Sequence, residues 1–145
     1  MSKSNTWETG LLELLFTNAD FTGVGDAGGL LGSATAGSLY FSLHTADPDE
    51  TGDQTTNEVA YTDYARVAVA RSGAGWTVTD DAVAVDANVT FPVGSGGSGI
   101  ATHWGLGTAS SGAGKLLYKG AISPNIAIAS GVTPKLTTAS TVTED

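Results

Sequence analysis

The residues with the clearest potential for chemistry lie in an acidic loop between residues 47 and 58. Its spacing matches the first, third, sixth and last positions of an EF-hand calcium loop, at Asp47, Asp49, Gly52 and Glu58. Thr51 and Gln54 depart from that pattern, and the flanking residues have strand patterns instead of paired helices. Because hard cations prefer oxygen ligands, the candidate cation loop consists of Asp47, Asp49, Asp53 and Glu58. The alternative is a solvated acidic loop.

Two glycine-rich segments imitate phosphate-binding motifs. Residues 94–99 spell G-x-G-x-x-G, but residues 100–104 after them have the pattern of a strand, whereas the motif requires a helix N-terminus there. Residues 107–115 resemble a P-loop, but Ala113 stands where the lysine is required. We therefore expect both segments to be flexible loops, and we expect no cofactor.

The chain has two histidines, His44 and His103. Each alternates with apolar neighbours on a predicted strand, so we expect both side chains to face solvent or an interface. Hydrolysis by a serine–histidine pair needs a serine on a strained turn, and the sequence contains no G-x-S-x-G motif. We expect no catalytic residues and no enzymatic activity.

Residues 5–17 have the one good helical pattern. Asn5 can cap this helix, and Glu8 follows at capping-box spacing. Gly10 weakens it by about 1 kcal/mol relative to alanine. The apolar residues exceed a single stripe, so we expect them to pack under the domain's own sheet or to contact a neighbouring subunit. These candidate interface residues are Trp7, Leu11, Leu12, Leu14, Leu15 and Phe16.

From residue 38 the hydrophobic period changes to that of β-strands. Short strands are predicted at residues 39–44, 65–71, 76–79, 82–85, 89–93, 100–106, 116–122, 126–128, 133–136 and 140–143. Closely spaced strands without intervening helices predict an all-β fold, an antiparallel β-sandwich or jelly roll of about seven to nine strands. The expected organisation is an N-terminal helix with an extended Gly-rich arm over residues 1–37, followed by a β-sandwich domain over residues 38–145.

Composition excludes several classes of protein. The 145 residues include no cysteine, so disulfides and thiolate metal sites are absent. The formal charge is −9 and the basic residues are scattered, which argues against binding to nucleic acid. The apolar runs are too short for a membrane span, and the N-terminus lacks the pattern of a signal peptide.

Five segments resemble, in their order, small structural proteins of tailed-bacteriophage virions, often labelled tail fibre or tail proteins and similar to capsid decoration (cement) proteins. The segments are Leu39–Pro48, Tyr64–Arg66, Val89–Pro92, Thr102–Gly105 and Leu116–Ala121. The resemblance implies a compact antiparallel β fold and a structural role without enzymatic activity.

From this resemblance we expect a capsid decoration protein that binds the outer surface of the head and stabilises it. The acidic charge suits the outside of a DNA-filled shell better than its interior. A tail or fibre-attachment component is the alternative within this class, and a carbohydrate-binding host-recognition module is the alternative outside it. The expected partners are the major capsid protein or tail proteins, with further copies of the chain in a homo-oligomer, but no nucleic acid and no membrane. The expected location is the virion, after synthesis in the host cytoplasm.

Overall fold

The computed structural model describes residues 2–144 and contains two compact units. Unit 1 comprises Met1–Ser38, Ala70–Asn88 and Thr137–Asp145, and unit 2 comprises Leu39–Val69 and Val89–Leu136. Each unit therefore joins segments that are far apart in the sequence. The division into residues 1–37 and 38–145 stays a prediction about domains.

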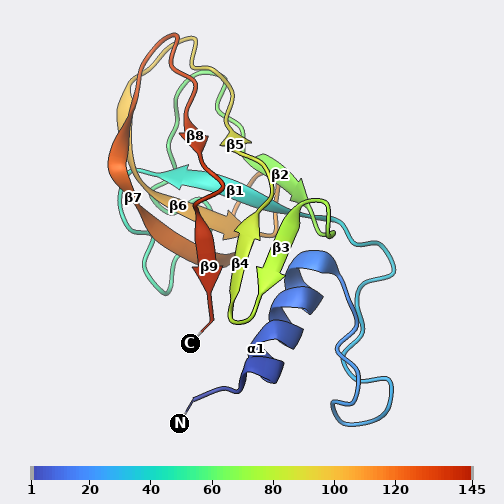
Figure 1. Cartoon of the computed structure of the whole chain (residues 1–145). Helices are drawn as coiled ribbons and strands as arrows, with labels where there is room; N and C mark the ends of the chain where they lie inside the picture. Colours follow the sequence, from blue (N-terminus) through green and yellow to red (C-terminus); the bar gives the residue numbers. More distant parts are fainter. Residues whose placement is uncertain (1, 145) are drawn as a thin grey trace. The chain divides into compact units, whose positions relative to one another are not determined.

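Unit 1 packs one helix against a small sheet (Figure 1). The α-helix α1 (Asn5–Leu12) continues into a π-helical turn, η1 (Glu13–Thr17). The antiparallel sheet has the order β3 (Trp76–Thr79), β4 (Ala82–Val85), β9 (Thr141–Thr143). Phe16 is fully buried, and its ring meets that of Trp76 edge-on, with centroids 4.7 Å apart. Burial of such aromatic surface is a main source of stability for a unit of this size.

The N-cap of the helix lies one residue earlier than the sequence indicates. Ser4 has an extended backbone and is the N-cap, and its Oγ accepts a hydrogen bond from the Trp7 amide at 3.4 Å. The predicted cap at Asn5 is therefore wrong, and Glu8 falls one position beyond the capping-box place. At the other end Arg71 donates to the carbonyls of Leu14 and Leu15, which a helix C-terminus leaves without helical partners. Within residues 2–144, no helix is long and apolar enough to cross a membrane.

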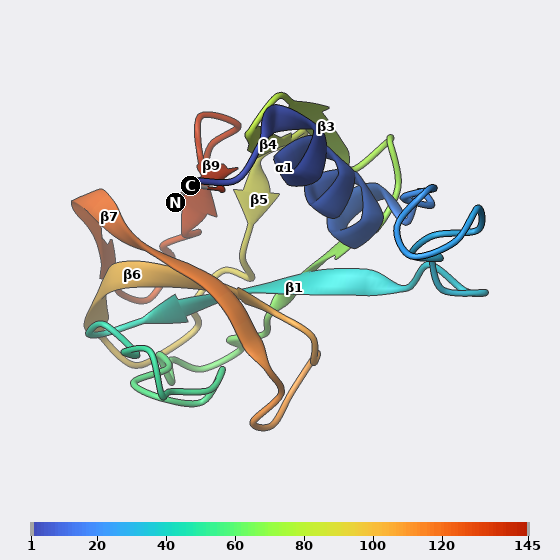
Figure 2. The same cartoon turned by 90° about the horizontal axis from the view of Figure 1, so that it is seen from below.

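Unit 2 is built on a four-stranded sheet, seen from below in Figure 2. Its order is β2 (Val67–Ala70), β1 (Ser38–His44), β6 (Gly99–Gly107), β7 (Leu116–Ile128). The strands β5 (Val89–Thr90) and β8 (Lys135–Leu136) form a separate antiparallel pair. Both β1 and β6 are largely buried, with apolar core residues that include Phe41, Leu43 and Leu106. The predicted all-β class with one N-terminal helix is confirmed, and the sheets fit a sandwich, whereas jelly-roll connectivity stays a prediction.

The predicted strands at residues 100–106 and 116–122 pair as an antiparallel hairpin, and β7 is longer than expected. The segments predicted at residues 116–122 and 126–128 form one strand, and a register shift between Ala101 and His103 lets β6 follow it. Gly120 is required here because a Cβ atom at this position would lie 2.7 Å from the Trp104 indole. The buried Trp104 ring therefore packs directly on the backbone at Gly120.

Candidate functional site

The segment predicted as an extended arm is a closed loop that returns beside α1 (Figure 1). The Asn18 side chain exchanges two hydrogen bonds with the backbone of Ser33, at 2.8 and 2.9 Å. Phe21 and Leu30 exchange both backbone hydrogen bonds, at 2.8 and 2.9 Å. Side chains of Asn and Asp can replace regular secondary structure in this way because they accept from nearby amides. The expectation of an extended connector is therefore wrong.

Phe21 of this loop packs directly on the helix at Gly10. A Cβ atom at Gly10 would lie 2.6 Å from the Phe21 ring, closer than packed carbon atoms approach. The Phe21 ring also contacts Trp7, with centroids 5.6 Å apart. Gly10 lowers the helix propensity of α1, but its missing side chain leaves the space that the Phe21 ring occupies.

A shallow groove of about 550 Å³ runs between α1 and this loop, and we call it the α1 groove. Phe21 supplies its aromatic surface, and the exposed residues Glu13 and Asp20 supply two carboxylates. Its complete lining is Asn5, Thr6, Thr9, Gly10, Glu13, Asp20, Phe21 and Thr22. A groove lined by an aromatic ring and two carboxylates can hold a chain segment that is apolar and basic.

The six predicted interface residues divide into two groups. Leu12 and Phe16 are buried and belong to the core of the protein. Trp7 is 38% exposed, and the remaining three residues are partly exposed: Leu11, Leu14 and Leu15. Leu31 of the adjoining loop is 68% exposed and adds to the apolar surface of unit 1. A subunit contact through this region stays a prediction, and within it Trp7 is the accessible aromatic residue.

We expect Gly10→Ala to destabilise unit 1 although alanine is the better helix former. The new methyl group must displace the Phe21 ring, and overpacking of this kind costs about 1–3 kcal/mol against a gain in helix propensity of about 1 kcal/mol. Thermal unfolding measures the difference. Gly73→Ala is the matched control, because no atom lies within 4 Å of a Cβ at that position. A Gly10→Ala variant as stable as the wild type would contradict this packing.

The acidic loop does not gather its carboxylates around one point. Asp47 accepts hydrogen bonds from Lys119 Nζ at 2.8 Å and from the Asp49 amide at 2.9 Å. Asp53 accepts from the amide and hydroxyl of Thr55, at 2.8 and 2.6 Å. These bonds lower the pKa of the Asp47 and Asp53 carboxyls. In the part of the chain that the structure describes, no three His, Asp or Glu side chains are grouped to hold a metal ion.

Glu58, the fourth residue of the candidate cation loop, forms an ion pair with Arg66. Its two oxygens accept from Arg66 Nε at 2.7 Å and from a terminal Arg66 nitrogen at 2.8 Å, a bidentate pair. The Arg66 side chain is 2% exposed, and the carboxylate raises its pKa. The hydroxyl of Tyr64 donates to the same carboxylate at 2.8 Å, and its burial raises the pKa of this phenol.

The same arginine anchors the loop at the tip of the β6–β7 hairpin. Its terminal nitrogens donate to the carbonyls of Ala109 and Gly112, at 2.9 and 2.8 Å. Gln54 is fully buried beneath the loop and accepts from the Ala109 amide at 2.9 Å. The segment at residues 107–115 that resembles a P-loop is therefore held by two buried side chains, contrary to the expectation of a flexible loop. In the sequence, Arg66 stands out because it is the only lysine or arginine between residues 4 and 70.

The second glycine-rich segment is held mainly by its backbone. The Gly94 amide donates to the Val132 carbonyl at 3.0 Å, and the Gly94 carbonyl accepts from Gly131 at 2.8 Å. The Gly96 carbonyl accepts from the Thr62 amide at 2.9 Å. Because these hydrogen bonds hold the backbone of the segment against neighbouring residues, the expectation that residues 94–99 form a flexible loop is also wrong.

His44 is fully buried, so the expectation that it faces solvent or an interface is wrong. Its Nδ1 lies 2.8 Å from the Thr56 carbonyl, and its Nε2 lies 2.8 Å from Ser42 Oγ. A carbonyl only accepts, so Nδ1 carries the proton and Nε2 accepts from the Ser42 hydroxyl. Burial lowers the His44 pKa. Gly105 on β6 lies against the ring, since a Cβ there would be 2.6 Å from Nε2.

This arrangement resembles the first two members of a hydrolytic triad but cannot act as one. Ser42 and His44 are both 0% exposed, so no substrate can reach the hydroxyl. His103 is partly exposed, and its Nδ1 lies 2.9 Å from the hydroxyl of its neighbour Thr102. The Ser42–His44 pair therefore joins β1 to the segment containing Thr56 and has a structural role.

The chain matches the model of a known protein family. The model of the family described as Podophage GP4 fiber I protein gp80 matches residues 2–144. No curated protein matches the chain. The match spans both units, including the α1 groove and the network around Arg66.

Proposed function

The chain belongs to the Podophage GP4 fiber I protein gp80 family, a family of tailed-phage virion structural proteins, and from this we propose that it is a component of the phage fibre. The family match over residues 2–144 is the observation that carries the proposal. The proposed location is the tail region of the virion, outside the capsid shell.

In this role the protein acts through contacts and not through catalysis. The Ser42–His44 pair supports this view because both side chains are inaccessible. Buried anchors at Arg66 and Gln54 hold the hairpin tip in one conformation. A structural component benefits from such rigidity, since preformed surfaces lose less conformational entropy on assembly.

The proposed partners are neighbouring tail proteins, together with further copies of this chain. The exposed apolar residues of unit 1, among them Trp7 and Leu31, support a role in assembly. Exposed aromatic and aliphatic residues of this kind serve as anchors in protein interfaces.

Capsid decoration is the second candidate, with the major capsid protein as partner. The formal charge of −9 favours it, because an acidic protein is repelled by packaged DNA and suits the outer face of the shell. A decoration protein that binds the assembled lattice, and not its free subunits, stabilises that lattice by mass action.

Immunogold labelling of purified virions tests the location. We expect label at the tail, with few copies per particle on a calibrated gel. Label distributed over the head, at a stoichiometry near that of the major capsid protein, would reject the fibre role and support decoration. Absence of the protein from washed particles would reject both roles.

A further inference from the structure

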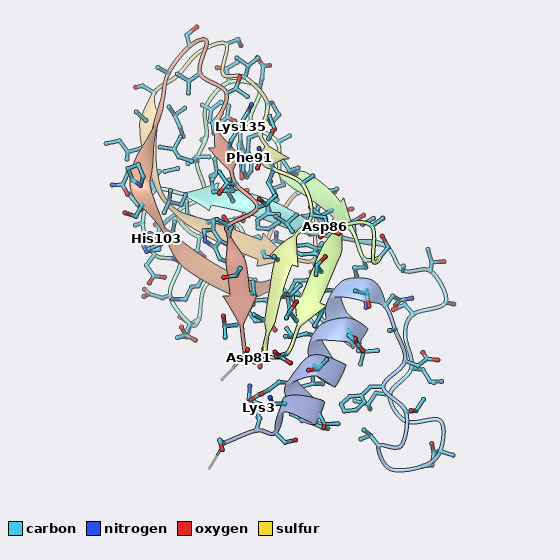
Figure 3. All side chains as sticks on the ribbon, in the orientation of Figure 1. Lys3, Asp81, Asp86, Phe91, His103 and Lys135 are labelled. Atoms are coloured by element: carbon cyan, nitrogen blue, oxygen red, sulfur yellow. The ribbon has the colours of Figure 1, made fainter. Side chains whose placement is uncertain are left out.

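The negative charge of the protein is concentrated in unit 1. By sequence, unit 1 carries nine acidic and two basic residues, a formal charge of −7, whereas unit 2 carries six acidic and four basic residues, a formal charge of −2. Both basic residues of unit 1 are engaged internally. Lys3, in the segment before α1 in Figure 3, pairs with Glu144, and Arg71 binds backbone carbonyls. The surface of unit 1 is therefore predominantly negative.

The α1 groove lies in this acidic unit and offers an apolar surface as well. Glu13 and Asp20 are exposed in its lining, and Phe21 provides an aromatic face. Trp7, in contact with Phe21, is 38% exposed. A lysine or arginine at such a site is attracted by the face of the aromatic ring, through a cation–π interaction. It is also attracted by the nearby carboxylates, through an ion pair.

We propose that the α1 groove is the docking site for a basic segment of a neighbouring virion protein, in which lysine or arginine residues flank an apolar side chain. This inference rests on the proposed virion role. The apolar side chain packs on Phe21 and Trp7, while the flanking cations pair with Glu13 and Asp20. Individual exposed ion pairs are weak, so the apolar contact supplies most of the affinity and the charges select the partner.

Charge also argues against negatively charged occupants of this groove. Unit 1 of a second copy also carries a formal charge of −7, so two such units repel each other when their grooves face. Nucleic acid and anionic lipid headgroups are repelled for the same reason. Two copies of this chain therefore do not pair groove to groove.

The test is rebinding of the purified full-length protein to virions from a phage that lacks its gene. Co-sedimentation at about 50 mM and about 500 mM salt gives the half-saturating concentration, because exposed charge pairs are screened at the higher salt. The groove variant is Glu13→Gln/Asp20→Asn, which keeps the shape and the Asp20 acceptor for the Gly32 amide. The matched control, Asp80→Asn/Asp81→Asn, removes the same charge from the β3–β4 turn of unit 1, where Figure 3 labels Asp81.

We expect the groove variant to need a roughly tenfold higher concentration at low salt, with a smaller difference at high salt, while the control binds as the wild type does. Trp7→Ser should weaken binding at both salt concentrations. Equal binding of groove variant and wild type would overturn the docking site, and so would equal weakening by the groove and control variants. If the wild type fails to rebind at either salt concentration, the virion role itself fails, which distinguishes the two proposals.

Discussion

Replacement of Arg66 by methionine should lower the free energy of unfolding by about 3–5 kcal/mol, the largest effect expected of a single substitution here. Methionine keeps most of the volume but leaves Glu58, whose side chain is 15% exposed, without its bidentate partner. It also removes the donors to the Ala109 and Gly112 carbonyls. A domain of this size is typically stable by about 5–15 kcal/mol, so the loss is a large fraction of the total.

Urea unfolding measures this loss, and hydrogen exchange locates it. Exchange should accelerate at residues 108–115, the loop that Arg66 anchors. Lys119→Met is the matched control, because Lys119 forms its ion pairs with Asp47 and Glu50 at the surface, where such pairs contribute little to stability. If Arg66→Met does not fold, Arg66→Lys serves instead, since lysine keeps the charge without the planar fork and should give an intermediate loss. Similar stability of the Arg66 and Lys119 variants would contradict the anchoring role.

Much of the fold could be predicted because its information is local. The strands at residues 76–79 and 82–85 have the observed bounds, and the helical region at residues 5–17 matches α1 and η1 together. Alternation along a strand and apolar periodicity along a helix depend only on neighbouring residues. The resemblance to tailed-phage structural proteins is confirmed by the family match.

The errors arise where distant residues meet. His44 alternates with apolar neighbours, which suggests the outer face, but the Thr56 carbonyl and the bare backbone at Gly105 enclose its ring. The glycine-rich segments look flexible by composition, whereas Gln54 and Arg66, far from residues 107–115 in the sequence, hold one of them. A pattern within one strand cannot report partners from other segments, so polar side chains buried by tertiary contacts were missed.

Stability should decrease as the pH falls below about 6.5, and His44 should cause this decrease. The folded state lowers the pKa of His44 through burial, with the guanidinium of Arg66 and the neighbouring His103 acting in the same direction. The Thr56 hydrogen bond and the Glu58 carboxylate oppose the shift without reversing it. Below about pH 6.5 the unfolded chain binds a proton at His44 that the folded chain does not. The free energy of unfolding then falls by up to about 1.4 kcal/mol per pH unit, until the lowered folded pKa is reached.

This window separates His44 from the carboxylates with lowered pKa values. Asp47 and Asp53 contribute stability above about pH 3.8, and that contribution is lost only at lower pH. Urea unfolding between about pH 7 and pH 5 therefore isolates the histidine. His44→Gln should be less stable at pH 7 but should lose the slope, whereas His103→Gln should retain it. If the glutamine variant does not fold, NMR titration of the His44 ring in the wild type gives the same answer, and a pKa at or above 6.5 would contradict the burial argument.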